Sequence, residues 1–571
     1  MTSECPLDCV IVGYNDVSFP DLVKTYEAIK HYSGAYHSIR TNSVPVGTER
    51  VTYMELLNRS IARRTGRHPG LHVAKMPSLG AWHLRSFLAA NGYRAAVVNA
   101  FNFEQDLLLE LLAHAPACVA VTTTFYLDAR PIREIVDFVR RHSPDTPIVA
   151  GGPHIFNVCE FYESDDEALR DVLEEMGAQL YVHDSQGELT LSRIVAHLRG
   201  DRFAHETAVE PSGAVRKTNS LTLADHRPVS TVHLEDIPNL VYVRHGSLVR
   251  TRRQPESNDM DAFATGWSDV AARHFTPTAP TRTARSCAFS CSFCRYPILA
   301  GPLNLTSLDR IEQQFNEFDR RGVRQLVIID DTFNVPLPRF KDLLRMMIRN
   351  NYGFEWFAYF RASNSDDECF DLMERSRCGG VFLGIESGDQ QILNNMNKSA
   401  SVDKYARAIA QLNVRGIITF ACLIAGFPGE TDESIRTTID FIRESKPLYY
   451  RVELYYHGVN APIHERASEF GLKGAGFSWS HDSMDWKGAV EHISGMYQEI
   501  EESIILPVYM YDFWGIPYLL GQGLSKEQLL EFNRRAGRWL RDDLAGNPID
   551  SRTSIDHLAA IGEPAQPAGC H

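Results

Sequence analysis

The sequence predicts an α/β protein with a doubly wound N-terminal sheet, then a partial (β/α)6 barrel, then a small C-terminal helical region. Two observations predict this fold class. Short apolar segments alternate with helical patterns over residues 1–200, which is typical of a doubly wound parallel sheet. The alternation resumes at residue 281 and continues to residue 470, and a run of six βα units favours an open barrel. A chain of 571 residues is also too long for one hydrophobic core.

The N-terminal region contains five strand candidates, each ending at small or polar residues. The strands are expected at residues 7–12, 95–99, 119–123, 147–150 and 179–183. Helical patterns are expected at residues 79–91, 131–141 and 188–198. No G-x-G-x-x-G sequence follows the first strand, so a nicotinamide site is not expected. Ligands of such sheets bind beyond the carboxyl ends of the strands.

Residues 201–280 are polar and have little periodicity, so they are interpreted as a connector. The barrel strands are expected at residues 281–286, 325–330, 355–360, 380–385, 417–424 and 449–455. Helices are expected between them, for example at residues 307–320, 337–350 and 402–415. Residues 471–571 are first aromatic and then helical, and the tail from residue 562 is expected to be disordered.

The composition indicates an ordinary soluble protein, with 44% hydrophobic and 23% charged residues. No apolar run reaches 18 residues, and the N-terminus does not have the pattern of a secretory signal. The 11 cysteines are irregularly spaced, which favours a reducing, cytoplasmic location over a disulfide framework. The net charge of −14 argues against nucleic acid as the main partner, and no membrane partner is expected.

Three cysteines, Cys287, Cys291 and Cys294, follow the first predicted barrel strand. Their C-x3-C-x2-C spacing provides three thiolates from one short loop. Three thiolates leave one iron of a 4Fe–4S cluster without a protein ligand, and that iron is free to bind a reactant. The alternative is a structural zinc site with His274 as the fourth ligand, although zinc sites usually use cysteine pairs separated by a longer loop.

The triplet, with the aromatic residue Phe293 before its last cysteine, resembles the cluster motif of the radical SAM enzymes. The resemblance implies that the open iron binds S-adenosylmethionine (SAM). One electron from the cluster would then cleave SAM to a 5′-deoxyadenosyl radical. It also implies an external one-electron donor, such as a flavodoxin or ferredoxin. In such enzymes the cofactors supply the difficult chemistry and the protein positions them.

The barrel carries further motifs of that family. The run G-I-E-S-G at residues 384–388 ends the fourth strand, where the family binds the SAM ribose with an acidic residue. The resemblance therefore implies that Glu386, with Ser387 beside it, accepts hydrogen bonds from the ribose hydroxyls. At the ends of the second, third and fifth strands the family binds the rest of SAM with residues that are here Asp331, Arg361 and Gly426. For Asp331 and Arg361 the alternative is an ordinary ion pair.

The N-terminal region resembles the Rossmann-like cobalamin-binding domain that precedes the barrel in one branch of this family. Three motifs after successive strands carry the resemblance: Thr122, Thr123 and Thr124; Gly151, Gly152, Pro153 and His154; and Gln186, Gly187 and Glu188. Glycines permit close approach of the backbone to a nucleotide tail, and hydroxyls satisfy its polar atoms. Ordinary turn chemistry is the alternative for each residue.

The chain has no D-x-H-x-x-G motif, so the resemblance does not imply a histidine ligand of that kind for cobalt. Three residues at the end of the first strand are the candidates to face cobalt or a bound water: Tyr14, Asn15 and Asp16. The expected domains are therefore a cobalamin-binding domain at residues 1–200, the connector, a radical SAM barrel at residues 281–470 and the C-terminal region.

Some stretches are most similar to the P-methyltransferase group of phosphinothricin biosynthesis: residues 8–15, 282–287, 330–339 and 512–518. The resemblance implies a cobalamin-dependent radical SAM methyltransferase of natural-product biosynthesis. It would move a methyl group from SAM, via methylcobalamin, to an unactivated carbon or a phosphinate phosphorus of a small-molecule or peptide substrate. Two alternatives stay open: cyclisation or rearrangement with the same cofactors, and a zinc-stabilised binding protein.

Overall fold

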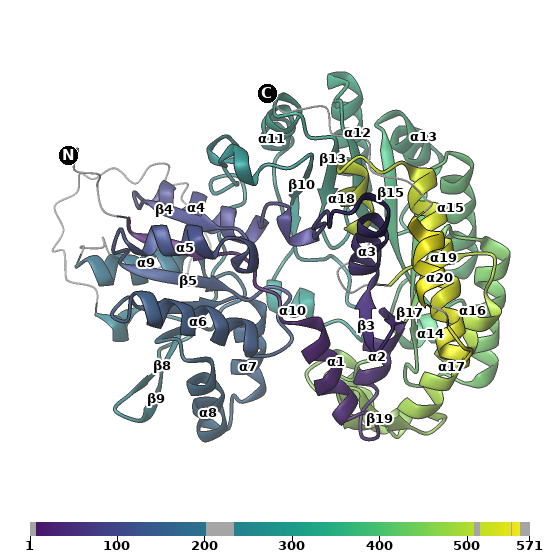
Figure 1. Cartoon of the computed structure of the whole chain (residues 1–571), viewed down its shortest axis with the longest axis horizontal. Helices are drawn as coiled ribbons and strands as arrows, with labels where there is room; N and C mark the ends of the chain where they lie inside the picture. The colour runs from purple at the N-terminus through teal and green to yellow at the C-terminus, as the bar shows by residue number, and fades with distance from the viewer. Residues whose placement is uncertain (1–6, 201–232, 508–513, 550, 560–571) are drawn as a thin grey trace, which may run out of the picture. The chain divides into compact units, whose positions relative to one another are not determined.

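The computed structural model describes residues 7–200, 233–507, 514–549 and 551–559, and it divides into two compact units (Figure 1). Unit 1 consists of Met1–Asp16 and Ser78–Gly266, and unit 2 consists of Val17–Pro77 and Trp267–His571. This division differs from the expected domains in two ways. Unit 1 extends beyond residue 200 to Gly266, and Val17–Pro77 belongs to the unit that contains the barrel. Residues 201–232 of the predicted connector and the predicted tail lie outside the described residues.

Unit 1 contains a seven-stranded sheet in which five strands are parallel. In spatial order the strands are β4 (Ala95–Val98), β1 (Cys9–Val12), β5 (Cys118–Thr122), β6 (Ile148–Gly151), β7 (Leu180–Val182), β8 (Leu240–Arg244) and β9 (Ser247–Arg250). The five predicted strands and the doubly wound order are confirmed. The order reverses between β1 and β5, which is the position where ligands bind in such sheets.

The hairpin of β8 and β9 was not predicted, and it extends the sheet on the side of β7 in antiparallel register. Its turn contains His245 at φ +50° and Gly246 at φ +77°, the left-handed pair of a type I′ hairpin. His-Gly is not one of the usual sequence signals for that turn. Part of the predicted connector therefore belongs to the first sheet.

Unit 2 contains a second seven-stranded sheet whose spatial order follows the chain, and all of its neighbours are parallel. Its strands are β10 (Thr278–Thr281), β13 (Gln325–Ile328), β14 (Glu355–Phe360), β15 (Cys378–Glu386), β16 (Ile418–Ala425), β17 (Tyr449–Leu454) and β21 (Ile504–Ile505). The sequential parallel order confirms the predicted partial barrel. In Figure 1 the helices labelled α12 (Leu337–Asn350), α13 (Asp367–Arg375) and α15 (Val402–Val414) lie outside its strands.

The first barrel strand is shifted from the predicted residues 281–286 to β10. The cause is Asp330, which is buried and accepts hydrogen bonds from the backbone of Thr283 (2.6 Å) and Ala284 (3.0 Å). These bonds turn the chain out of the sheet before the cysteine loop. Ala284–Arg285 then forms a separate short strand, β11, with β12 (Asn304–Leu305).

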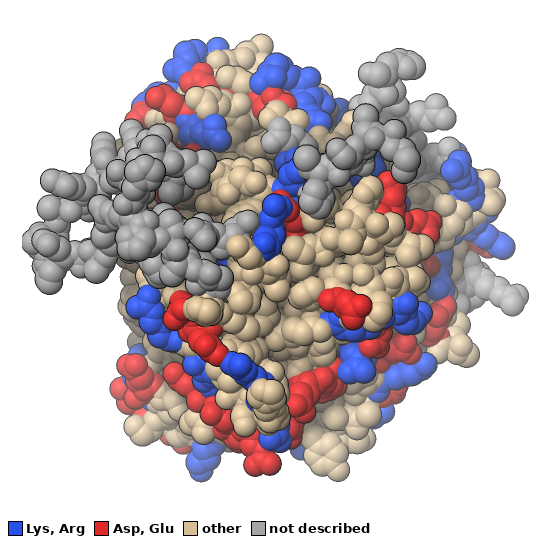
Figure 2. Space-filling view, turned by 90° about the vertical axis from the view of Figure 1, so that its left-hand side faces the viewer, with Lys and Arg blue, Asp and Glu red and all other residues tan. Residues whose placement is uncertain are grey.

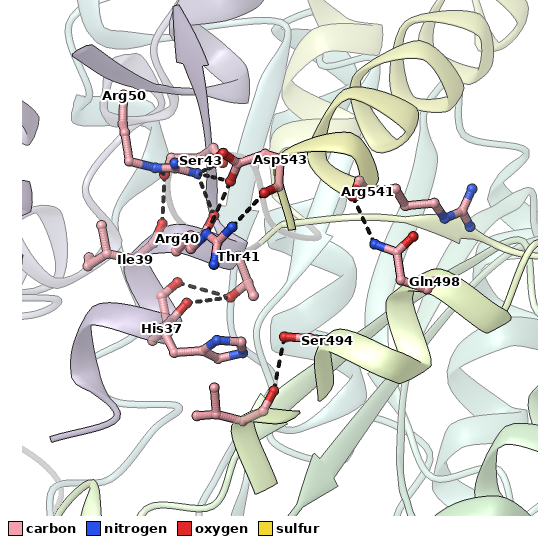
Figure 3. Close-up of polar contacts among 12 residues, drawn as sticks. His37, Ile39, Arg40, Thr41, Ser43, Arg50, Ser494, Gln498, Arg541 and Asp543 are labelled. Atoms are coloured by element: carbon pink, nitrogen blue, oxygen red, sulfur yellow. Dashed lines mark hydrogen bonds and ion pairs between the residues drawn. The ribbon is translucent and has the colours of Figure 1, made fainter. Parts of the chain in front are cut away.

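The N-terminal segment of unit 2 packs on the C-terminal helix α19 (Lys526–Ala545) through an ion-pair network (Figure 3). Arg50 Nη2 lies 2.9 Å from Asp543 Oδ2, and Arg40 Nε lies 3.3 Å from the same oxygen. The Arg50 and Asp543 side chains are only 12% and 14% exposed. Arg50 also donates to the carbonyl oxygens of Arg40 and Ser43. The network joins segments from opposite ends of the sequence.

Replacing Asp543 tests this network. Asp543→Asn removes the carboxylate and leaves two arginines without their anionic partner, so the free energy of unfolding should fall by about 3 kcal/mol. Urea unfolding followed by circular dichroism measures the change. Asp342→Asn, which removes an exposed ion pair with Arg345, is the matched control and should have little effect. Equal stability of the two variants would contradict a stabilising role for the network.

Candidate functional site

The three cysteines lie on the loop after β11, and all three thiols are free. The loop is held by residues 395–397: Ser292 N donates to Met396 O at 2.8 Å, Ser292 Oγ to Asn395 O at 3.0 Å and Asn397 Nδ2 to Ser290 O at 2.8 Å. A hydrogen bond from Cys294 N to Cys291 O closes the turn. The backbone that presents the thiols is therefore fixed by another part of the barrel.

The donor set fits a cluster with one open iron. Burial raises the pKa of Cys294, and the neighbouring Cys291 and Cys287 add to the effect, so the three thiols lie within electrostatic range of each other. Within the described part of the chain, no three His, Cys, Asp or Glu side chains converge on one metal ion. A cluster does not require such convergence, because each thiolate binds a different iron. His274, the fourth ligand of the zinc alternative, instead accepts a hydrogen bond from Arg273 Nε.

Glu386 ends β15 at a backbone irregularity, with φ +65° and a shift in register after Gly384. Its Oε1 lies 2.6 Å from Lys398 Nζ, and both side chains are 9% exposed. A Cβ at Gly384 would lie 2.7 Å from Glu386 Oε1, so the glycine makes room for the carboxylate. Ser387 is fully buried, and its Oγ contacts Thr438 Oγ1 and accepts from Asp389 N. Ser387 therefore supports the bulge and does not reach a ligand.

Lys398 was not identified from the sequence, because it lies in a polar turn with no motif of its own. Only the folded structure shows that its ion-pair partner is Glu386. The ammonium group also lies 5.5 Å from the ring centroid of Phe293. Lys398 thus contacts both the acidic residue of the G-I-E-S-G run and the aromatic residue of the cysteine motif.

Arg361 is a buried cation with incomplete hydrogen bonding. Its side chain is 7% exposed, and its guanidinium carbon lies 3.5 Å from the ring centroid of Phe289 on the cysteine loop. Nε and Nη2 are buried and have no hydrogen-bond partner among the described residues. A buried guanidinium group needs an acceptor. This favours an anionic ligand over the alternative of a structural ion pair. Asp331 is exposed beside the buried Asp330.

The loop after β16 is built around glycine and a buried acid. Gly426 has φ +91°, and a Cβ there would lie 2.3 Å from the ring of Trp479. Phe427 contacts Phe293 edge to face at 6.5 Å. Glu430 is fully buried and accepts from Gly426 N at 2.5 Å. Burial raises the pKa of Glu430 to about 8, although the backbone N–H groups of Gly426 and Phe427 partly oppose the shift.

In unit 1, the threonines after β5 join neighbouring strand ends. Thr122 Oγ1 donates to Gly13 O at 2.5 Å, and Thr123 Oγ1 donates to Gly151 O at 3.0 Å. These two hydroxyls therefore already donate to backbone carbonyl oxygens. The third threonine, Thr124, is partly exposed. Gly152 has φ +112°, and a Cβ there would lie 3.1 Å from Thr123 N. Gly152 is therefore needed at this position, because Thr123 fills the space where a side chain would begin.

Three buried polar atoms near these strand ends have no hydrogen-bond partner among the described residues: Asn15 Oδ1, His154 Nε2 and the hydroxyl oxygen of Tyr126. Burial lowers the pKa of His154, which favours its neutral form. Pro153 is exposed at the start of α7 (Pro153–Phe161). Unpaired buried polar groups are costly, so this edge fits a polar ligand.

The residues after β1 are mostly committed to the protein. Asn15 is buried, and its Nδ2 donates to Pro131 O (2.9 Å) and Glu134 Oε2 (3.0 Å) on α6 (Arg130–His142). The Tyr14 ring contacts Tyr126 at 6.1 Å, and the backbone N of Asp16 donates to Asn102. Asn15 Nδ2 therefore anchors α6, whereas Asn15 Oδ1 is buried with no hydrogen-bond partner among the described residues, so its expected role beside a ligand stays a prediction.

The third expected motif, Gln186, Gly187 and Glu188, is hydrogen-bonded to Glu256 and Asn258 of the returning chain. Gln186 Nε2 donates to Glu256 O at 2.7 Å, and Asn258 Nδ2 donates to Glu188 Oε2 at 2.8 Å. The Glu256 carboxylate accepts from two backbone N–H groups at the start of α9 (Glu188–Arg199), where an anion is stabilised. Gly187 has φ +79° as the N-cap. Gln186 and Glu188 are therefore bonded to the returning chain, and their expected contact with a nucleotide tail stays a prediction.

Residues 281–442 match the Radical SAM superfamily. This stretch contains the cysteine loop, Arg361, Glu386 and Gly426. It is therefore a radical SAM domain, whose cofactors are a 4Fe–4S cluster and SAM. The zinc-stabilised binding protein is not supported by this match.

The fold is shared with solved cobalamin-dependent radical SAM enzymes. The methyltransferase TsrM from Kitasatospora setae, solved with cobalamin and a 4Fe–4S cluster, is 17% identical with a TM-score of 0.54, covering 96% of this chain and 100% of that chain. OxsB, solved with aqua-cobalamin, is 13% identical with a TM-score of 0.55, covering 97% of this chain and 80% of that chain. At these identities the likeness shows the fold, and it confirms the predicted fold class.

Two relatives found by sequence are matched over only part of their length. The ribosomal protein uS12 methylthiotransferase RimO of Pelotomaculum thermopropionicum is 29% identical over 30% of this chain, which spans 40% of its length. The anaerobic magnesium-protoporphyrin IX monomethyl ester cyclase of Rubrivivax gelatinosus is 22% identical over 66% of this chain, which spans 65% of its length. The narrower resemblance to the P-methyltransferase group stays a prediction.

The surface adds two observations. On the face drawn in Figure 2, Lys and Arg side chains are interspersed with Asp and Glu, so the described residues there form no basic stripe of the kind that binds nucleic acid. Across the described residues, no helix combines the length and apolar character needed to cross a bilayer.

The buried Glu430 should make stability depend on pH. Its pKa of about 8 lies above its usual value, so the folded state holds a proton that the unfolded state has lost. The free energy of unfolding should therefore fall as pH rises from about 5 to 8, by up to about 1.4 kcal/mol per pH unit. Glu430→Gln should remove this slope in urea unfolding.

The exposed Glu433, on the adjoining helix α16 (Asp432–Ser445), provides the control, and Glu433→Gln should keep the wild-type slope. The same pH slope in Glu430→Gln and wild type would refute a protonated Glu430.

Proposed function

We propose that the protein is a cobalamin-dependent radical SAM methyltransferase acting on a small-molecule or peptide substrate. One observation carries the proposal: a chain with a radical SAM domain also contains a doubly wound sheet with unpaired buried polar atoms beyond its strand ends. The fold shared with TsrM and OxsB supports it. When bound, the cofactors supply a carbon-centred radical and a cobalt that carries the methyl group.

In unit 2, the chain's own residues bind and orient. Cys287, Cys291 and Cys294 would hold three irons of the cluster and leave one for the amino and carboxylate groups of SAM. Glu386, fixed by Lys398, would accept hydrogen bonds from the ribose hydroxyls with its remaining oxygen. The unpaired nitrogens of Arg361 would bind the SAM carboxylate, which would satisfy the buried cation. Gly426 lets the backbone approach the adenine closely, and Asp331 lies at the open side among the polar residues of the second strand end.

In unit 1, the residues proposed to hold cobalamin lie beyond the ends of β1, β5 and β6. Thr124, the Gly151–Gly152 backbone, His154 and Tyr126 surround the ends of β5 and β6. Tyr14 and Asp16 remain the candidates beside cobalt or its bound water. Thr122, Thr123 and Asn15 support this edge from within the protein. The proposal does not include a histidine ligand to cobalt from a D-x-H-x-x-G motif, which this sequence lacks.

The cyclase relative supports a second candidate, which uses the same cofactors without methyl transfer. The two candidates differ in the fate of the SAM methyl group. Enzyme reconstituted without oxygen, given a low-potential reductant and methyl-labelled SAM, should place label on the bound cobalamin and release S-adenosylhomocysteine. Deoxyadenosine without labelled cobalamin would favour cyclisation or rearrangement. This readout does not require the substrate to be known.

The cysteine loop is tested by removing one thiol. Cys291→Ala should reduce bound iron from about four per chain and abolish deoxyadenosine formation, because two thiolates do not retain the cluster. Cys369→Ala, which removes a thiol on α13 outside the loop, is the control and should keep both. Iron and sulfide analysis and product chromatography measure the outcome. Deoxyadenosine formation by Cys291→Ala would refute the cluster assignment.

A further inference from the structure

The inner face of the second sheet carries charged residues that the proposed cofactor contacts do not use. Gly384 on β15 is paired with Cys422 on β16, and Cys422 with Arg451 on β17. Residues paired in this way point to the same face of a sheet. Glu453, two residues after Arg451, lies on that face as well. Since the Glu386 carboxylate fills the space beside Gly384, this face is also the one that carries the proposed SAM contact.

Arg451 is buried and incompletely bonded, like Arg361. Its side chain is 8% exposed, and its Nη2 forms an ion pair with Glu453. Its Nε is buried and has no hydrogen-bond partner among the described residues. Leaving a buried charged donor unpaired is unfavourable. Glu453, by contrast, is partly exposed, so the pair is accessible from one side.

An aromatic layer lies next to these charges. Phe382 and Phe420, two residues before Gly384 and Cys422 on the same face, contact each other with ring centroids 4.8 Å apart. Tyr359 on β14 contacts Phe382 at 4.9 Å. Phe382 and Tyr359 are partly exposed. The face therefore offers a charged pair and, one layer further toward the amino ends of the strands, an apolar surface.

The charges on this face decide what kind of ligand fits. Glu386 is neutralised by Lys398, and Arg451 by Glu453. A lone carboxylate bound to Arg451 would leave one negative charge uncompensated in a buried site, which is costly. A group that carries both a carboxylate and an ammonium adds no net charge. It can accept from Arg451 and donate to Glu453, so two ion pairs replace one.

We propose that Arg451 and Glu453 recognise the head group of an amino-acid substrate, with the carboxylate on Arg451 and the ammonium on Glu453. This inference rests on the proposed function and names its substrate class. The apolar part of the substrate lies against Phe382 and Tyr359. Two strand spacings separate Arg451 from Gly384, about 10 Å. The head group is therefore held on a different strand from the proposed SAM contact.

The test is calorimetric binding to the reconstituted full-length enzyme with SAM and no reductant, so that no turnover occurs. The probes are the standard α-amino acids and, for those that bind, their N-acetyl and methyl-ester derivatives. At least one free amino acid should bind, and each derivative should bind at least ~10-fold more weakly because it loses one ion pair. Arg451→Met should abolish binding, and Arg451→Lys should weaken it.

Glu453→Gln should weaken binding of the free amino acid but not that of the N-acetyl derivative, which has no ammonium. Arg349→Met, which removes an exposed arginine paired with Glu312, is the control and should bind as wild type. If Arg451→Met does not fold, the uncharged double variant Arg451→Met/Glu453→Met takes its place and should also lose binding.

Three results would overturn the inference: no binding of any free amino acid by the wild type, equal binding by Arg451→Met, or equal binding of the N-acetyl derivatives. Cobalamin labelling and deoxyadenosine formation, measured on the same samples, report the proposed function separately. No binding of any free amino acid by the wild type, with both activities intact, overturns only the substrate class.

Discussion

The ion pair between Glu386 and Lys398 is the interaction on which the barrel site depends. It is buried, and it joins the end of β15 to the turn at residues 395–398. The same turn binds the cysteine loop through Met396 and Asn397. One segment thus positions both the acid proposed to hold the SAM ribose and the loop proposed to hold the cluster. Because a buried charge is stable only with its partner, neither element can move independently of the other.

Hydrogen-bond satisfaction separates the residues that support the sites from those available to a ligand. Ser387, Asn15, Gln186 and Glu188 have protein partners, so they hold loops and helices in place. Buried atoms of Arg361, Arg451, His154 and Tyr126 have none among the described residues. Since an unpaired buried polar group is unfavourable, those of these atoms that lie beside the proposed cofactor and substrate contacts are the ones assigned to ligands. The distinction applies in both units, although their folds differ.

The two sheets also explain why the polar residues lie where they do. The strands β1, β5, β6 and β7 of unit 1 are almost fully buried, as expected for a parallel sheet covered on both faces, whereas the edge strand β4 is partly exposed. Ligand contacts are then limited to the loops beyond the strand ends. The barrel strands instead alternate, with Phe382, Gly384, Cys422, Ile424 and Glu453 partly exposed on one face. That face is able to contact a substrate along the strands as well as at their ends.

Periodicity and spacing alone determined most of the architecture. The predicted β14 and α12 coincide with the observed elements, and the other predicted strands except β10 differ by a few residues at their ends, because apolar alternation reflects local burial. The spacing of the three cysteines likewise indicated the cluster loop, since all of its residues are close in the sequence.

Long-range contacts decided the rest. The packing of residues 17–77 on α19 depends on Asp543. The position where β10 ends depends on Asp330. Residues 256–258 supply the hydrogen-bond partners of Gln186 and Glu188. Lys398 and Arg451 acquire their partners only when separate strands and turns meet. No local pattern encodes these pairings, because each is the outcome of burying charges that must be neutralised within the folded chain.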